Sequence, residues 1–178
     1  MLRSFLTLGF WSGLFALFFN IISQTLLTQV GLVPAFILLL AVVAFGIFFD
    51  LIGTAAAAAD EKPFHSMAAA RVKGARTAVW LVRNADRVTT VCNDLIGDIS
   101  GTLSGAMAAA IVYRILLIRP GLSETVLSTL MVTVVAALTV GGKAAWKKVA
   151  LTYSEQIIYR VARVIRFLYR RELARKKR

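Results

Sequence analysis

Long runs of apolar residues constrain the fold of this 178-residue chain more than any other feature. A helix needs about 20 mostly apolar residues to cross the hydrocarbon core of a bilayer. Four stretches meet or approach that length, at residues 5–27, 33–54, 89–117 and 126–140. Backbone amides must be paired within lipid, so each stretch is expected to be a helix. We therefore predict an all-α, polytopic membrane protein with about four transmembrane helices.

The composition supports this class. Apolar residues make up 58% of the chain and charged residues only 17%, whereas soluble domains carry about 25% charged residues. The single cysteine, Cys92, excludes an intrachain disulfide framework. No glycine-rich phosphate loop, nucleophile elbow or zinc-protease motif is present, so we expect neither an enzyme nor an organic cofactor.

Positive charge is distributed unevenly and predicts the orientation of the chain. Of the 21 Lys and Arg residues, 12 lie from Lys143 onward and 6 lie between Lys62 and Arg87. Loops rich in Lys and Arg stay in the cytoplasm. We therefore expect an inner (plasma) membrane protein with both termini cytoplasmic. Dense basic charge can also attract nucleic acid, but beside a membrane span anionic lipid explains it better.

Two cytoplasmic segments follow from this topology. The segment 55–88 is expected to contain a helix along the membrane surface, from Ser66 to Asn84. Residues 143–178 form a second region after the transmembrane domain of residues 1–142. Within it, Tyr153 to Arg171 has apolar residues at helical spacing, with arginines on the other faces. This pattern predicts a basic amphipathic helix suited to anionic lipids. Arg114, inside the third span, is expected to extend toward the outer surface.

Polar and small residues gather on one face of the second span and one face of the third. At about 100° per residue, the second span places Gly46, Asp50, Gly53 and Thr54 within roughly 100° of arc. In the third span, Asn93, Asp94, Gly97, Asp98, Gly101 and Gly105 fall within about half the circumference. Repeated small residues let helices approach closely, so we expect Gly97, Gly101 and Gly105 to pack against another helix.

Where the two faces meet, a small cavity lined by oxygen atoms is expected. Carboxylate, amide and hydroxyl oxygens suit Mg²⁺, Ca²⁺ or Mn²⁺, and ionisable groups within a span are rare unless functional. The predicted metal ligands are Asp50, Thr54, Asn93, Asp94 and Asp98, with Asp60 and Glu61 attracting cations at the cytoplasmic mouth. Two alternatives remain: conduction of H⁺ or Na⁺, and a purely structural role in which glycines pack and carboxylates pair with basic residues.

Two stretches resemble the transmembrane domain of the CorC/CorB and cyclin M family. These are Phe48-Phe49-Asp50-Leu51-Ile52-Gly53-Thr54-Ala55 and, after a basic helix, Asn84-Ala85-Asp86-Arg87 ahead of a polar, glycine-rich span. Asp50 stands where the family's first motif serine would be, and Thr54 keeps a hydroxyl. The resemblance covers roughly residues 35–142. It implies a transporter of Mg²⁺ or Co²⁺, with the ion as substrate.

Three functions compete at this point. The leading hypothesis is a divalent cation transporter that works as a homodimer, with a separate protein carrying the family's cytosolic nucleotide-sensing (CBS) domains as a candidate partner. The rival is a membrane scaffold or regulator that binds partner helices and anionic lipid without transport. The third is a proton-coupled carrier. Nucleic acid is not an expected partner of any of them.

Overall fold

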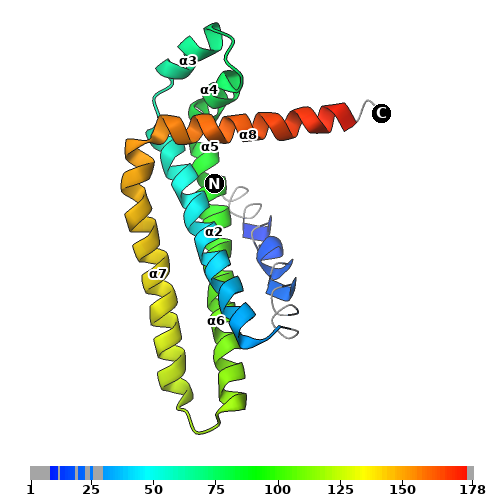
Figure 1. The fold of residues 1–178 in the computed structure, drawn as a ribbon, viewed down its shortest axis with the longest axis vertical. Helices are drawn as coiled ribbons and strands as arrows, with labels where there is room; N and C mark the ends of the chain where they lie inside the picture. Colours follow the sequence, from blue (N-terminus) through cyan, green and yellow to red (C-terminus); the bar gives the residue numbers. More distant parts are fainter. Residues whose placement is uncertain (1–8, 12, 19, 23–24, 26–29, 176–178) are drawn as a thin grey trace. The chain divides into compact units, whose positions relative to one another are not determined.

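The computed structural model describes residues 9–11, 13–18, 20–22, 25 and 30–175, with side chains described to residue 168. These described residues form helices and no strands, as Figure 1 shows. The predicted all-α membrane class is therefore confirmed. Of the predicted first span, residues 5–27, the structure describes 9–11, 13–18, 20–22 and 25, and the other residues of that span lie outside the described part.

In the part of the chain that the structure describes, three helices are long and apolar enough to cross a membrane. The first is α2, Leu32–Ala58. The second is a continuous helix, Ala85–Ile118, in which α5 (Ala85–Thr89), the π-helix η1 (Thr90–Gly97) and α6 (Asp98–Ile118) follow one another. The third is α7, Glu124–Thr152. They correspond to the predicted spans at 33–54, 89–117 and 126–140.

The predicted end of the last helix at residue 140 is wrong, whereas the end of the membrane span at that residue stays a prediction. Helix α7 continues through Gly141 and Gly142 to Thr152. A Cβ placed on Gly142 would overlap the Ile47 side chain of α2. The absence of a side chain at Gly142 therefore lets α7 lie close to α2, and the Gly-Gly pair is a packing feature, not a helix stop.

The predicted single surface helix from Ser66 to Asn84 is also wrong. The structure has two short helices, α3 (Lys62–Ala69) and α4 (Ala75–Arg83), joined by a turn. Two turn residues adopt positive φ, Arg71 at 56° and Gly74 at 94°. That backbone cannot continue a right-handed helix. The predicted tail helix is present as α8, Ser154–Arg175.

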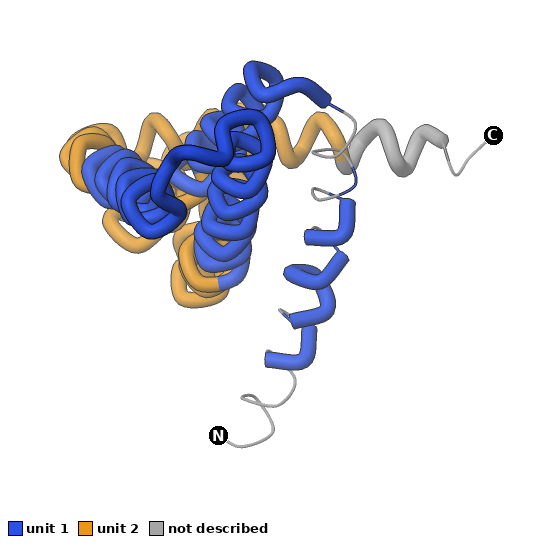
Figure 2. The backbone as a smooth tube through the Cα atoms, turned by 90° about the horizontal axis from the view of Figure 1, so that it is seen from below, with its two compact units in different colours: residues 1–48, 95–143 blue, residues 49–94, 144–178 orange. Residues whose placement is uncertain are grey.

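The chain forms two compact units, which Figure 2 colours separately. The first comprises residues 1–48 and 95–143. Its core is apolar and comes from three helices, with Ala35, Leu39 and Val43 on α2, Met107, Ala108 and Ile111 on α6, and Val135 on α7. In the same unit, the Arg114 guanidinium donates a hydrogen bond of 2.5 Å to the carbonyl oxygen of Val30. The Arg114 charge is thus held by a backbone group just before α2 begins.

The second unit comprises residues 49–94 and 144–178. Its core joins parts of five helices: Ala55 and Ala56 on α2, Phe64 on α3, Ala78 and Leu81 on α4, Ala150 on α7, and Ile158 and Ala162 on α8. Phe64 is 1% exposed, although a proline precedes it and the segment was expected to lie on a surface. This core fixes α3, α4 and α8 as one packed body. The proposed boundary between residues 142 and 143 follows the expected membrane edge and stays a prediction.

Candidate cation site

The two polar faces predicted from sequence do meet, at one place in each unit. In the first unit, a Cβ on Gly46 would lie 2.9 Å from the Ser100 Cβ. In the second, a Cβ on Gly53 would overlap the Asn93 side chain and lie 3.1 Å from the Cys92 Cβ. At both places a glycine of α2 removes the side chain that would keep the facing helix away.

Asn93 is the most unusual polar group of this contact. Its Oδ1 atom is buried and has no hydrogen-bond partner. An unpaired buried acceptor costs about 1–3 kcal/mol, so native proteins rarely leave one without a reason. The oxygen lies against Gly53, where any larger residue would displace it. This arrangement leaves an acceptor available to a positively charged ligand.

Asn93 lies in η1, and the helix type matters. A π-helix forms i→i+5 hydrogen bonds, is rare, and often marks functional sites. Here it occupies Thr90–Gly97 between two α-helical parts of one continuous span. The wider turn changes which side chains face α2, compared with an uninterrupted α-helix. Both Cys92 and Asn93 consequently contact Gly53 although they are adjacent in sequence.

Two further oxygen groups belong to this neighbourhood. The Thr89 hydroxyl donates a hydrogen bond of 3.3 Å to the Gly53 carbonyl oxygen, which ties α5 to α2. Asp50 and Thr54 flank Gly53 on α2, about 40° from each other around the helix, and both are half-buried. A carboxylate, a hydroxyl and a carboxamide oxygen therefore come from one short stretch of α2 and from the π-helix that packs on it.

The two remaining predicted ligands, Asp94 and Asp98, differ from these residues in their exposure. Asp94 and Asp98 are exposed, and Asp98 begins α6 in the other compact unit. Among the described residues, no group of three or more His, Cys, Asp and Glu side chains is close enough to hold a metal ion. The five-residue ligand set stays a prediction, with Asn93 as its best-placed member.

Comparison with known families decides the assignment. The model of the cyclin M transmembrane N-terminal domain matches residues 36–171, most of the chain. The chain belongs to the cyclin M family. Its membrane domain is of the CorC/CorB type, which is associated with metal transport. No curated protein and no solved structure matches it significantly. The resemblance noted from the motifs at residues 48–55 and 84–87 is thereby confirmed.

In this cyclin M domain, Glu61 has bonding partners that the sequence did not reveal. His65 Nε2 donates to the Glu61 carboxylate at 2.8 Å, and the Arg83 guanidinium donates to it at 2.6 Å. These contacts lower the pKa of Glu61 below its ordinary value, His65 contributing most. Since Arg83 compensates its charge, Glu61 chiefly connects α3 to α4. Asp60 accepts a hydrogen bond of 3.1 Å from the Lys62 amide, just before α3.

The predicted glycine ladder of the cyclin M domain divides into two parts. Gly97 is buried, whereas a Cβ on Gly101 or Gly105 would meet nothing within 4 Å. The buried face of α6 is formed instead by Ser100, Ser104, Met107, Ala108, Ile111 and Val112. A side chain at Gly101 or Gly105 would therefore meet open space among the described residues, where this face of α6 is exposed.

Sequence reasoning missed three residues of the Ala85–Ile118 helix that contact α2. None of them, Thr89, Cys92 or Ser100, was assigned to the predicted site. A signal did exist for Ser100, because it lies on the face that α6 turns toward Gly46. No sequence signal marked Cys92, because its contact with Gly53 depends on the π-helix.

Proposed function

We propose that this cyclin M domain moves a divalent cation, Mg²⁺ or Co²⁺, across the bacterial-type inner membrane. The observation that carries the proposal is the buried, unpaired Asn93 Oδ1 facing Gly53. Family membership adds the association with metal transport. Asp50, Thr54, Asp94 and Asp98 complete the proposed set of oxygen ligands.

The chemistry of the donors suits a hydrated divalent ion. Mg²⁺ loses water reluctantly and is usually held by one or two carboxylates together with several water molecules. An amide oxygen and the Asp50 carboxylate would hold such an ion without removing its whole hydration shell. A site of this kind binds weakly enough to release its ion, as transport requires.

The exposed carboxylates support a homodimer. Charged groups facing lipid cost at least about 2.5–3.5 kcal/mol near the bilayer centre. Asp98 lies on the exposed face of α6 with Gly101, Thr102, Gly105 and Ala109, within about 100° of arc. We propose that this face, named here the open α6 face, contacts a second copy. The contact would shelter Asp98 and use the small residues for close packing.

A flux assay tests the proposal. The full chain is reconstituted in vesicles and challenged with a panel of Mg²⁺, Co²⁺, Ca²⁺, Na⁺ and H⁺ gradients. We expect divalent flux that Asp50→Ala and Asn93→Leu reduce at least about tenfold, a loss of one ligand interaction. Thr129→Val is the control, since the Thr129 hydroxyl bonds only to its own helix at Thr125. Flux that follows pH alone would instead support the proton-coupled carrier.

A scaffold function is the rival, and the open α6 face favours it too. That face would bind a partner helix, while the basic tail binds anionic lipid. The scaffold hypothesis predicts no flux of any ion from the wild-type chain. It also predicts that Gly101→Leu abolishes association while the carboxylate variants stay assembled. Wild-type divalent flux with loss in Asp98→Ala would exclude it.

A further inference from the structure

Two adjoining hollows lie in the second unit where the α3–α4 turn packs beside α8. One has a volume of about 480 Å³ and is lined by Lys73, Arg160, Arg163, Val164, Arg166 and Phe167. The other has a volume of about 310 Å³ and is lined by Ala68, Arg71, Val72, Gly74, Arg76, Thr77 and Arg166. Arg166 belongs to both, so we treat them together as the basic hollow.

Six cationic side chains line the basic hollow, and no acidic side chain does. The carboxylate nearest in sequence to this turn, Glu61, is paired with His65 and Arg83, and no lining cation is paired with a carboxylate of the described residues. Arg163 lies over the Tyr159 ring, 5.8 Å from its centre, which leaves its charge uncompensated. Such a concentration of like charge favours an anionic ligand.

The basic hollow rests on a packed frame. A Cβ on Gly74 would lie 3.0 Å from the Arg163 Cγ and 3.4 Å from the Arg163 backbone. The turn thus lies directly against α8, and only glycine allows both this contact and the φ of 94°. Ala75, Ala78, Ile158 and Ala162 are buried beneath. The cations are attached to a fixed surface, so little ordering is needed when a ligand binds.

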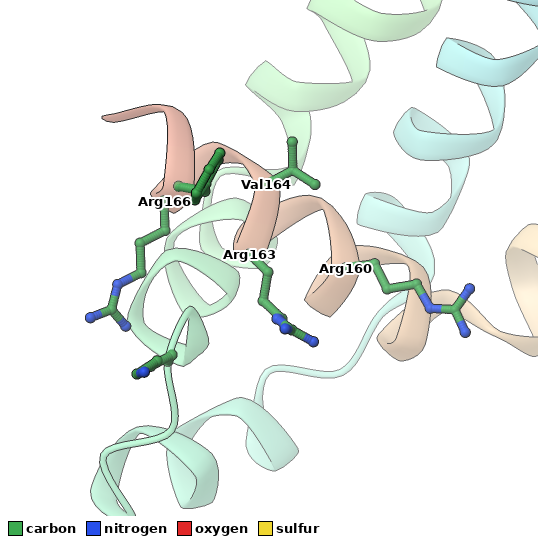
Figure 3. Close-up of a pocket in the computed structure, with 6 residues that line it drawn as sticks. Arg160, Arg163, Val164 and Arg166 are labelled. Atoms are coloured by element: carbon green, nitrogen blue, oxygen red, sulfur yellow. The ribbon is translucent and has the colours of Figure 1, made fainter. Parts of the chain in front are cut away.

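Two arginines of the hollow, Arg163 and Arg166, point away from the apolar arc of α8. Val164, Ile165 and Leu168 are 40–59% exposed and span about 100° of α8. Arg163 and Arg166 lie about 150° from the middle of that arc. Figure 3 shows both arginines extending from the side of α8 opposite Val164. Val164 and Phe167 also line the hollow, so if the apolar arc lies on a bilayer, as amphipathic helices do, the hollow lies at the bilayer edge with Arg163 and Arg166 directed toward water.

We propose that the basic hollow binds a soluble, multiply charged phosphate anion. Arginine forks match phosphate oxygens with two parallel hydrogen bonds, and this accounts for arginine at five of the six cationic positions. The Thr77 hydroxyl adds an uncharged donor at the same wall. Helix α4 also begins here without a side-chain cap or an acidic residue in its first turn, which adds a weaker positive field. The site is independent of the cation site and of transport.

The test uses the full chain in nanodiscs of zwitterionic phosphatidylcholine, with EDTA present so that no divalent ion takes part. Sodium triphosphate is titrated, and binding is followed by calorimetry and by the thermal unfolding temperature. We expect saturable binding that weakens as ionic strength rises. Replacing two lining residues together, Arg71→Gln with Arg166→Gln, should weaken binding about tenfold or more.

The matched control removes the same charge elsewhere, by Lys147→Gln with Lys148→Gln on α7, and should bind triphosphate as the wild type does. Equal weakening in both double variants would mean diffuse attraction and would overturn the proposal. So would the absence of triphosphate binding to the wild type. A third arm uses vesicles containing phosphatidylglycerol. Vesicle binding that depends on Arg71 and Arg166 without triphosphate binding would assign the hollow to lipid headgroups and contradict a soluble ligand.

Discussion

At the scale of single residues, Gly53 and Gly101 make a matched pair. A methyl group added at Gly53 would overlap Asn93 Oδ1, whereas one added at Gly101 would meet nothing within 4 Å. Overpacking a tight contact costs about 1–3 kcal/mol. We therefore expect Gly53→Ala to lower the unfolding temperature in detergent by several degrees and Gly101→Ala to leave it unchanged or raise it. Equal effects of the two variants would contradict the α2–η1 contact.

Glu61 gives the domain a defined acid sensitivity. Its pKa in the folded protein is lowered from the ordinary value of 4.5 by hydrogen bonds from His65 and Arg83. The stabilisation is therefore complete above the unfolded pKa and disappears as pH falls through the lowered folded pKa. We expect Glu61→Gln to unfold at a lower temperature than the wild type at neutral pH. The difference should vanish at a pH well below 4.5. A difference that persists there would contradict the ionic contribution.

At the scale of whole helices, the open α6 face predicts an oligomer. Gly101→Leu places a large side chain where a Cβ would meet none of the described residues within 4 Å. We expect it to abolish dimer formation, measured by light scattering in detergent, while the unfolding temperature of the monomer stays unchanged. Ser104→Leu is the comparison, because Ser104 is only 2% exposed. It should destabilise the chain itself. A Gly101→Leu chain that remains dimeric would remove this face from the interface.

Two kinds of sequence signal were used to predict this fold, and the helical spacing of residues was more informative than the positions of helix-breaking residues. The faces bearing Gly46 and Gly53 were predicted to meet the third span, and both do, because helical spacing fixes which side chains share a face. Gly141, Gly142 and Gly74 were harder to interpret. The first two lie inside a helix, whereas Gly74 lies in the turn just before α4 begins. Neighbours distant in sequence, Ile47 and Arg163, decide these outcomes, so local composition alone cannot. The π-helix at Thr90–Gly97 likewise could not be predicted, because no repeat of apolar or polar residues in the sequence marks it.

For the molecule as a whole, the distribution of basic residues predicts the orientation in the membrane. Single cysteines are introduced at Ser123 and Glu155, both exposed, in a Cys92→Ser background. We expect a membrane-impermeant maleimide to label position 123 in intact cells and position 155 only after permeabilisation, since Lys and Arg favour the cytoplasm. Labelling of position 155 in intact cells would reverse the proposed topology.

The most direct test of the cation site measures whether Mg²⁺ stabilises the folded chain through Asn93. A ligand present at 100 times its dissociation constant stabilises a protein by about 2.7 kcal/mol, or several degrees for a chain of this size. We predict that Mg²⁺ raises the unfolding temperature of the wild type and of Thr129→Val by this amount, and that Asn93→Leu abolishes the shift. Equal shifts in Asn93→Leu and the wild type, or no shift in any chain, would contradict a cation site at Asn93.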